Sequence, residues 1–110
     1  GNEYRINRVY ANGQPHGING SYHIDDNSMD AYTFVFYPIE PSYKYPQEID
    51  GHLHIRIDGL SHIISVEPLP NRGVFFPSNL IHKGNAYNHN VKEMRVSVAW
   101  KLQLIHKTNL

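Results

Sequence analysis

The sequence predicts an all-β chain, and three observations support that class. Short runs of β-branched and aromatic residues recur along the chain, for example at residues 32–39 and 94–105, and such residues favour strands. Turn signals rich in Gly, Pro, Asn and Asp separate these runs at close spacing. No stretch shows the apolar period of a helix over a useful length. This combination favours a sandwich or a jelly-roll barrel with few or no helices.

The expected strands are short and follow one another along the chain. The first occupies residues 4–10 and ends in a turn at Asn12-Gly13. The others are expected at residues 21–25, 32–39, 52–57, 60–67, 74–76, 81–82 and 94–105. Asp58-Gly59 gives a hairpin signal, and residues 68–73 give another turn. The segment 42–50 is a loop long enough to face a substrate.

The composition limits the possible functions. The 110 residues suffice for a single domain, residues 1–110. Ten Lys plus Arg balance ten Asp plus Glu without a run of like charge, which argues against nucleic acid or a membrane surface as a partner. The absence of cysteine excludes disulfides and thiolate metal sites and is compatible with the cytoplasm, the location we expect. No signal peptide or membrane-spanning run is expected.

His23 and Asp25 are the first candidate metal ligands. Side chains two positions apart on a strand share one face, so this imidazole and this carboxylate should point the same way. His82 is the candidate third ligand. Two His and one carboxylate leave open positions on an octahedral ion, the arrangement that suits non-haem Fe(II) oxygenases. A His-x-Asp pattern alone is a weak signal, because it often arises by chance.

A second histidine pair is an alternative source of metal ligands. His52 and His54 also lie two positions apart, and a cupin-like protein could use them with His82 to bind a metal. The residues that alternate with them, Leu53 and Ile55, are the natural core set. The pair is therefore expected to face outward.

Several motifs occur in a defined order. They are His23-Ile24-Asp25, an aromatic strand ending at Tyr37, Asp50-Gly51-His52-Leu53, a turn and Phe strand at 71–77, His82, and Arg95-Val96-Ser97. In order and spacing they resemble the 2-oxoglutarate- and Fe(II)-dependent dioxygenases, most closely the prolyl-4-hydroxylase-like branch. The resemblance covers about residues 13–103.

The resemblance implies a fold, two cofactors and an activity. The fold is a double-stranded β-helix, a cupin-like jelly roll, in which His23, Asp25 and His82 hold Fe(II). The activity is hydroxylation of a C–H bond in a small molecule or peptide, with peptidyl proline suggested by the branch, and with release of succinate and CO2.

The same resemblance assigns the binding of the cosubstrate. Arg95 is expected to grip the far carboxylate of 2-oxoglutarate, because a guanidinium binds a carboxylate bidentately. Tyr37 and Ser97 match family residues beside that carboxylate. Arg95 lies thirteen positions after His82, more than is usual in the family, so Lys92 remains the rival anchor. Asp50 replaces the first glycine of a family Gly-Gly pair.

The alternation on two strands also predicts apolar outer faces. If Arg95 and Ser97 point inward, then Val96, Val98 and Trp100 point outward, and the strand ending at Tyr37 repeats the pattern. In the family, helices N-terminal to the metal strand cover such faces, and this chain has almost nothing there. We expect a homo-oligomer packed through these faces or a truncated natural chain.

Two alternatives to the oxygenase stay open. One is a non-enzymatic, cupin-like jelly roll that binds a metal or small ligand; it needs no buried arginine beside the metal. The other is an inactive, degenerate fragment, which would retain Fe(II) poorly.

Overall fold

The structure is a computed structural model that describes residues 1–38, 49–57, 61–88 and 91–106. Within these ranges the chain forms strands, turns and irregular segments and no helix, so the all-β prediction is confirmed. The same part of the chain contains no helix with the length and apolar character needed to cross a bilayer.

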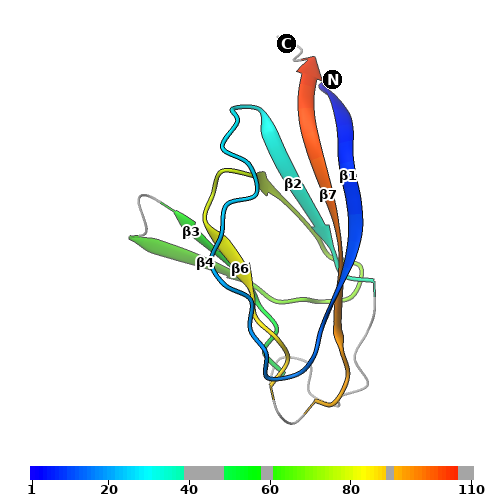
Figure 1. Ribbon diagram of the computed structural model, residues 1–110, viewed down its shortest axis with the longest axis vertical. Helices are drawn as coiled ribbons and strands as arrows, with labels where there is room; N and C mark the ends of the chain where they lie inside the picture. Colours follow the sequence, from blue (N-terminus) through cyan, green and yellow to red (C-terminus); the bar gives the residue numbers. More distant parts are fainter. Residues whose placement is uncertain (39–48, 58–60, 89–90, 107–110) are drawn as a thin grey trace.

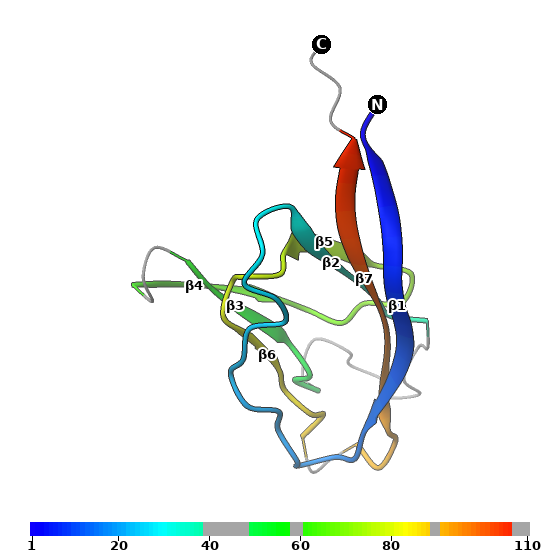
Figure 2. The ribbon, with the colours of Figure 1, turned by 45° about the horizontal axis from the view of Figure 1, so that its top comes forward.

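Seven strands are present in the described residues (Figure 1; β5 is labelled in Figure 2). They are β1 (Glu3–Gln14), β2 (Ala31–Phe36), β3 (Leu53–Ile57), β4 (His62–Val66), β5 (Gly73–Pro77), β6 (His82–Gly84) and β7 (Arg95–His106). Six of the eight expected strands match these within a few residues, and the first is longer than expected. The hairpin turn at 58–60 and most of the loop 42–50, including Tyr43 and Tyr45, lie outside the described residues.

The strands form two antiparallel sheets. The major sheet has the order β1-β7-β2-β5 and the minor sheet the order β4-β3-β6. Figures 1 and 2 show the two sheets as facing layers. β1, the first strand, pairs along its whole length with β7, the last strand. The ends of the described chain are therefore side by side.

The core lies between the two sheets. It contains Val35, Tyr37, Leu53, Ile55 and Phe76, all buried. These residues alternate with exposed or half-buried ones along their strands, as expected for sheets with one face toward the core. The outward position expected for His52 and His54 is thereby confirmed, since both are half-buried while Leu53 and Ile55 are buried.

The prediction of a turn at Asn12-Gly13 is wrong. Both residues belong to β1, where they pair with Ser97 and Val96. A glycine fits here for a different reason: a Cβ on Gly13 would lie 2.1 Å from the sulfur of Met94. The glycine therefore allows a close approach and does not mark a turn.

The strand expected at residues 21–25 is reduced to a single bridge. His23 donates its backbone N–H to the His82 carbonyl at 2.9 Å, and His82 returns a bond to the His23 carbonyl at 3.0 Å. Beyond this bridge, the Asp25 N–H donates to the Ser78 carbonyl at 3.1 Å instead. The segment thus changes partner every few residues, and local β propensity cannot predict such a change.

The outer face of the major sheet is aromatic, as the alternation predicts. Tyr32 stacks on Phe75 with ring centroids 5.0 Å apart, and Tyr4 meets both rings edge-on. Phe34 packs against Trp100 across the β2–β7 pair at 5.5 Å. Phe75 nevertheless remains 48% exposed. Aromatic contacts within the sheet cover this face only partly.

Candidate metal centre

His82 meets two side chains from a distant part of the sequence, His23 and Asp25, between the sheets. The backbone bridge between His23 and His82 sets these two residues side by side, with ring centroids 4.4 Å apart. Asp25 lies two residues farther along, with Oδ1 3.3 Å from His23 Nε2 and Oδ2 3.2 Å from His82 Nε2. One donor atom from each residue lies within 4.8 Å of the others. This geometry is consistent with the expectation that the side chains of His23 and Asp25 point the same way.

The backbone fixes which ring nitrogen faces the carboxylate. His23 Nδ1 lies 2.8 Å from the Ser21 carbonyl, and His82 Nδ1 lies 2.8 Å from the Leu80 carbonyl. A carbonyl oxygen only accepts, so Nδ1 carries the proton in each ring. Nε2 of both rings then faces Asp25, and either a proton on the ring or a bound cation can lie between the nitrogen and the carboxylate. One divalent ion is a cation that all three side chains together could bind.

Asp25 is held by further donors on its Oδ2 atom. Thr33, which is fully buried, donates its hydroxyl at 2.8 Å and is itself hydrogen-bonded to Ser78. Lys101 forms an ion pair with the same oxygen. Burial alone would raise the pKa of Asp25, but the hydrogen bonds and charges of His82, Lys101 and Thr33 outweigh burial and hold this pKa well below its usual range. The carboxylate is therefore ionised near neutral pH.

Arg95 is a buried cation at the other end of the same space. Its side chain emerges from β7, and the residue is 4% exposed. Nε donates to the Gly51 carbonyl at 2.8 Å, one terminal nitrogen to Gln14 Oε1 at 2.9 Å and the other to the Tyr37 hydroxyl at 3.2 Å. A guanidinium has five N–H donors. These three bonds orient the group and leave donors on both terminal nitrogens for a ligand.

Tyr37 and Ser97 complete the buried end. Burial raises the pKa of Tyr37 even though the Arg95 charge beside it acts in the opposite direction, so the phenol keeps its proton. Its oxygen accepts from Arg95, and its own O–H remains able to donate to an anion. Ser97, buried two residues after Arg95 on β7, faces the same side.

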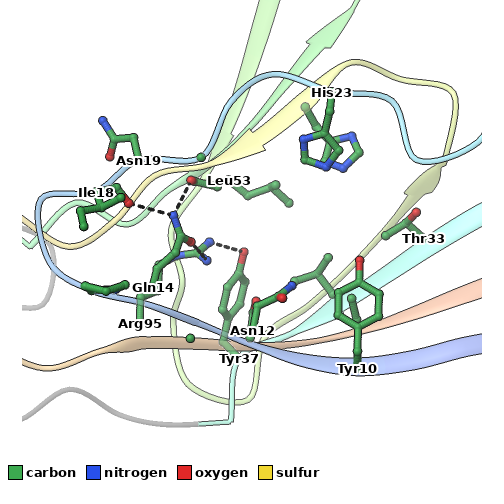
Figure 3. A pocket seen from close by; sticks show the side chains of 18 of the residues that line it. Tyr10, Asn12, Gln14, Ile18, Asn19, His23, Thr33, Tyr37, Leu53 and Arg95 are labelled. Atoms are coloured by element: carbon green, nitrogen blue, oxygen red, sulfur yellow. Dashed lines mark hydrogen bonds between the residues drawn. The ribbon is translucent and has the colours of Figure 1, made fainter.

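One cavity of about 400 Å³ connects both ends. Figure 3 places Arg95, Gln14 and Tyr37 at one end, and His23, Thr33 and Tyr10 at the other. Apolar side chains, among them Val35 and Leu53, line the space between. The side chain of His23 is 53% exposed whereas Arg95 is 4% exposed, so we call the end at His23 the open end and the end at Arg95 the closed end.

Comparison with solved structures identifies the fold. The chain is similar to a prolyl hydroxylase in complex with a hypoxia inducible factor oxygen degradation domain peptide fragment from Trichoplax adhaerens, with a TM-score of 0.67 and 19% identity. The fold is a double-stranded β-helix. The match covers 91% of this chain and 46% of that protein, so the chain spans about half of its length. No protein-family model and no curated protein matches the sequence.

The alternative anchor Lys92 and the alternative metal ligands His52 and His54 do not line this cavity. Lys92 is exposed and does not line the cavity, whereas Arg95 does. His52 and His54 line a different hollow, where His54 bonds to Ser65 and Asn85. Among the described residues, His23, Asp25 and His82 form the group of His and acidic side chains close enough to share an ion.

Three contacting residues were missed by the sequence reasoning. Gln14 orients Arg95, Thr33 holds Asp25, and Lys101 pairs with Asp25. Thr33 and Lys101 could have been found, because they continue the inward alternation of β2 and β7. Gln14 could not, because the predicted strand ended before it.

Asp50 stands at the position where the motif described above has the first glycine of its Gly-Gly pair. Its φ is 62°, a left-handed conformation in which a glycine is unstrained and an Asp is better tolerated than most residues. The next residue, Gly51, also has a positive φ of 82°, and its carbonyl is the acceptor for Arg95 Nε. The departure from the motif is therefore compatible with the conformation that this turn needs.

Proposed function

We propose that the chain is a 2-oxoglutarate- and Fe(II)-dependent dioxygenase that hydroxylates a C–H bond. The observation that supports this function best is the pairing of two features in one cavity. At the open end, two imidazole nitrogens and a carboxylate converge; at the closed end lies a buried, oriented arginine. A simple metal-binding jelly roll has no need of the second feature.

The donor set fits Fe(II). His23, Asp25 and His82 would bind the ion through two Nε2 atoms and one carboxylate oxygen. Asp25 Oδ1 lies 3.3 Å from His23 Nε2, close to the roughly 3 Å between adjacent ligands bonded at about 2.1 Å, and one ligand atom from each of the three residues lies within 4.8 Å of the others. Two His and one carboxylate with open positions suit a non-haem Fe(II) oxygenase. Because Thr33 and Lys101 occupy Oδ2 of Asp25, Oδ1 is the oxygen available to the metal.

The closed end fits a dicarboxylate. Arg95 would bind the far carboxylate of 2-oxoglutarate, Tyr37 would donate its hydroxyl to the same group, and Ser97 lies beside them on β7. Gln14 and Gly51 position the guanidinium without neutralising its charge, since both provide neutral oxygens. The charge of Arg95 thus remains available for the ligand.

Bound Fe(II) and 2-oxoglutarate would supply the oxidising power that places one atom of O2 in the substrate and the other in succinate, with loss of CO2. The residues of the chain bind and orient. Thr33 and Lys101 hold the Asp25 carboxylate, the Ser21 and Leu80 carbonyls keep both imidazoles in the ligating tautomer, and Val35 and Leu53 keep the wall between the two ends apolar. This wall limits water near the reacting atoms.

The substrate would enter at the open end beside His23. The similar prolyl hydroxylase was solved with a peptide, so we propose a peptide or small molecule as substrate and peptidyl proline as the first residue to try. We also propose that residues 1–110 act as a single oxygenase domain and that the protein works in the cytoplasm.

A titration under anaerobic conditions tests the function. Metal-free protein receives Fe(II) and then 2-oxoglutarate, and the weak visible charge-transfer band of the chelate is followed. We expect the band to appear only when both are present. Binding of iron without the band would favour the cupin-like alternative, and failure of the folded protein to retain iron would favour an inactive domain.

A methyl group added at Gly84 tests the fit of the arginine end. A Cβ at this position would lie 3.2 Å from both terminal nitrogens of Arg95, so Gly84→Ala must displace the guanidinium slightly. We expect a several-fold weaker affinity for 2-oxoglutarate with nearly unchanged Fe(II) affinity. An unchanged 2-oxoglutarate dissociation constant in the folded variant would argue against Arg95 as the anchor.

The homo-oligomer stays a prediction. The partly exposed aromatic face around Tyr32, Phe75 and Trp100 favours an association that buries it. We expect light scattering to give at least twice the mass of one chain, and Phe75→Glu to reduce that mass to one chain. A monomer that also binds no apolar dye would contradict the prediction.

A further inference from the structure

Lys101 is a cation inside the open end of the cavity that the proposed function leaves without a direct role toward substrate. It is the fourth inward side chain of β7, after Arg95, Ser97 and Ala99, and all four line the cavity. Its side chain is 20% exposed, and its ammonium group contacts Oδ2 of Asp25. The cavity therefore contains a cation at each end.

A second cation lies next to Lys101. Arg8 of β1 is the direct cross-strand partner of Lys101. Both approach the ring of Tyr10, with the Arg8 guanidinium carbon 4.7 Å and the Lys101 nitrogen 5.5 Å from its centroid. Tyr10 lines the cavity. The two cations and one ring thus form a cluster at the open end, which we call the Lys101 cluster: Arg8, Tyr10 and Lys101.

Like charges directly opposite on two strands destabilise a sheet unless an anion compensates them. Asp25 supplies such an anion to Lys101. A divalent ion bound to Asp25 would draw its negative charge away and place two more positive charges nearby. The other adjacent carboxylate, Asp26, is fully exposed and accepts a bond from the Ser28 N–H. With metal bound, the open end would carry an excess of positive charge.

We propose that the Lys101 cluster binds a carboxylate of the substrate at the open end of the cavity. This inference rests on the proposed function for the metal but concerns the substrate class. The carboxylate would accept bonds from Lys101 and Arg8 while the adjoining apolar part of the substrate lies against Tyr10. The target C–H bond would then belong to a molecule with an acidic group close to it.

Two sources provide that chemistry: a free amino or organic acid, and an acidic side chain of a peptide. Two probe pairs separate them, each differing only in carboxylate against amide. The peptide pair is acetyl-Pro-Asp-amide and acetyl-Pro-Asn-amide, and the free pair is L-proline and prolinamide. A preference for the acid in one pair identifies the source.

The experiment uses Zn(II)-loaded full chain with saturating 2-oxoglutarate, so that Arg95 is already occupied and no oxidation occurs. Each probe is titrated to millimolar concentration while NMR signals of Tyr10 and of the Lys101 side chain are followed. We expect the acid of at least one pair to bind about tenfold more tightly than its amide, the size of one charge-assisted hydrogen bond. Lys101→Met and Arg8→Met should each remove most of that difference.

Lys83 provides a matched control. It also lies over a tyrosine ring, 4.6 Å from the centroid of Tyr22, but does not line this cavity. Lys83→Met should leave the preference unchanged. Because Lys101 contacts Asp25, the zinc content of its variant is measured. Arg8 is exposed and is paired with Lys101 across the β1–β7 pair, so its variant decides the matter if Lys101→Met loses zinc.

Equal binding of acid and amide in both pairs, or no response of the Lys101 cluster to either acid, would overturn the proposal. Retention of the preference in Arg8→Met and Lys101→Met would do the same. The 2-oxoglutarate step is followed separately through the Arg95 Nε–H signal. Its failure would contradict the oxygenase function, while the probe titrations would still report on the anion site.

Discussion

Replacing Asp25 by alanine is expected to abolish the charge-transfer band of the Fe(II)–2-oxoglutarate complex. Asp25 is the carboxylate that both Nε2 atoms face, at 3.3 and 3.2 Å. Removing a mere supporting residue of a metal ligand typically costs 10- to 100-fold in affinity, so loss of the ligand itself should weaken Fe(II) binding by more than about a hundredfold. Anaerobic titration with Fe(II), followed by 2-oxoglutarate, measures both effects.

Asp26 gives a matched control for this variant. It carries the same charge one residue away, but it is fully exposed. Asp26→Ala should therefore bind Fe(II) like the parent protein. The Asp25→Ala variant leaves Lys101 and Thr33 without their acceptor, so its folding is checked by thermal unfolding. A folded Asp25→Ala protein that keeps the band would refute the proposed ligand set.

Replacing Arg95 by methionine is expected to raise the 2-oxoglutarate concentration needed for the band by at least about a hundredfold. A bidentate guanidinium–carboxylate pair provides two charge-assisted hydrogen bonds, each worth roughly 1.5–3 kcal/mol. The Fe(II) affinity should change little, because Arg95 lies at the opposite end of the cavity from His23 (Figure 3). Separate titrations of metal and cosubstrate distinguish these two constants.

Two further variants make the Arg95 experiment specific. Arg95→Lys keeps the charge but loses the planar fork, and we expect an intermediate loss of about tenfold. Lys92→Met removes the rival anchor, which is exposed, and should have no effect. If Lys92→Met weakened 2-oxoglutarate binding and Arg95→Met did not, the assignment of the two residues would have to be exchanged.

The sequence predicted the strand faces well because alternation is a local property of an extended chain. The side chains of Thr33 and Val35 on β2 and of Tyr37 just after it are buried, and those between them are half-buried. The inward position of Arg95 and Ser97 on β7 follows from the same geometry. No long-range information is needed for these statements.

Prediction was poorer where a second segment decides the conformation. Asn12-Gly13 has turn residues but continues β1, because β7 offers it a full set of backbone partners. The segment around His23 has strand residues but forms only one bridge, because its acceptors alternate between His82 and Ser78. Strand propensities differ between residue types by only about 1 kcal/mol, so backbone pairing with a second segment overrides them.

The all-β class, the side chains available to a metal, and the faces on which Arg95, Ser97 and Tyr37 lie can all be predicted from the sequence. The folded chain is needed to see how close His82 lies to His23 and Asp25, that Gln14 orients Arg95, and that Lys101 and Arg8 lie together at the open end. The physical reason is one of range. Alternation comes from the sterics of neighbouring residues, whereas these contacts depend on strand pairings between residues as far as 93 positions apart, as Arg8 and Lys101 are.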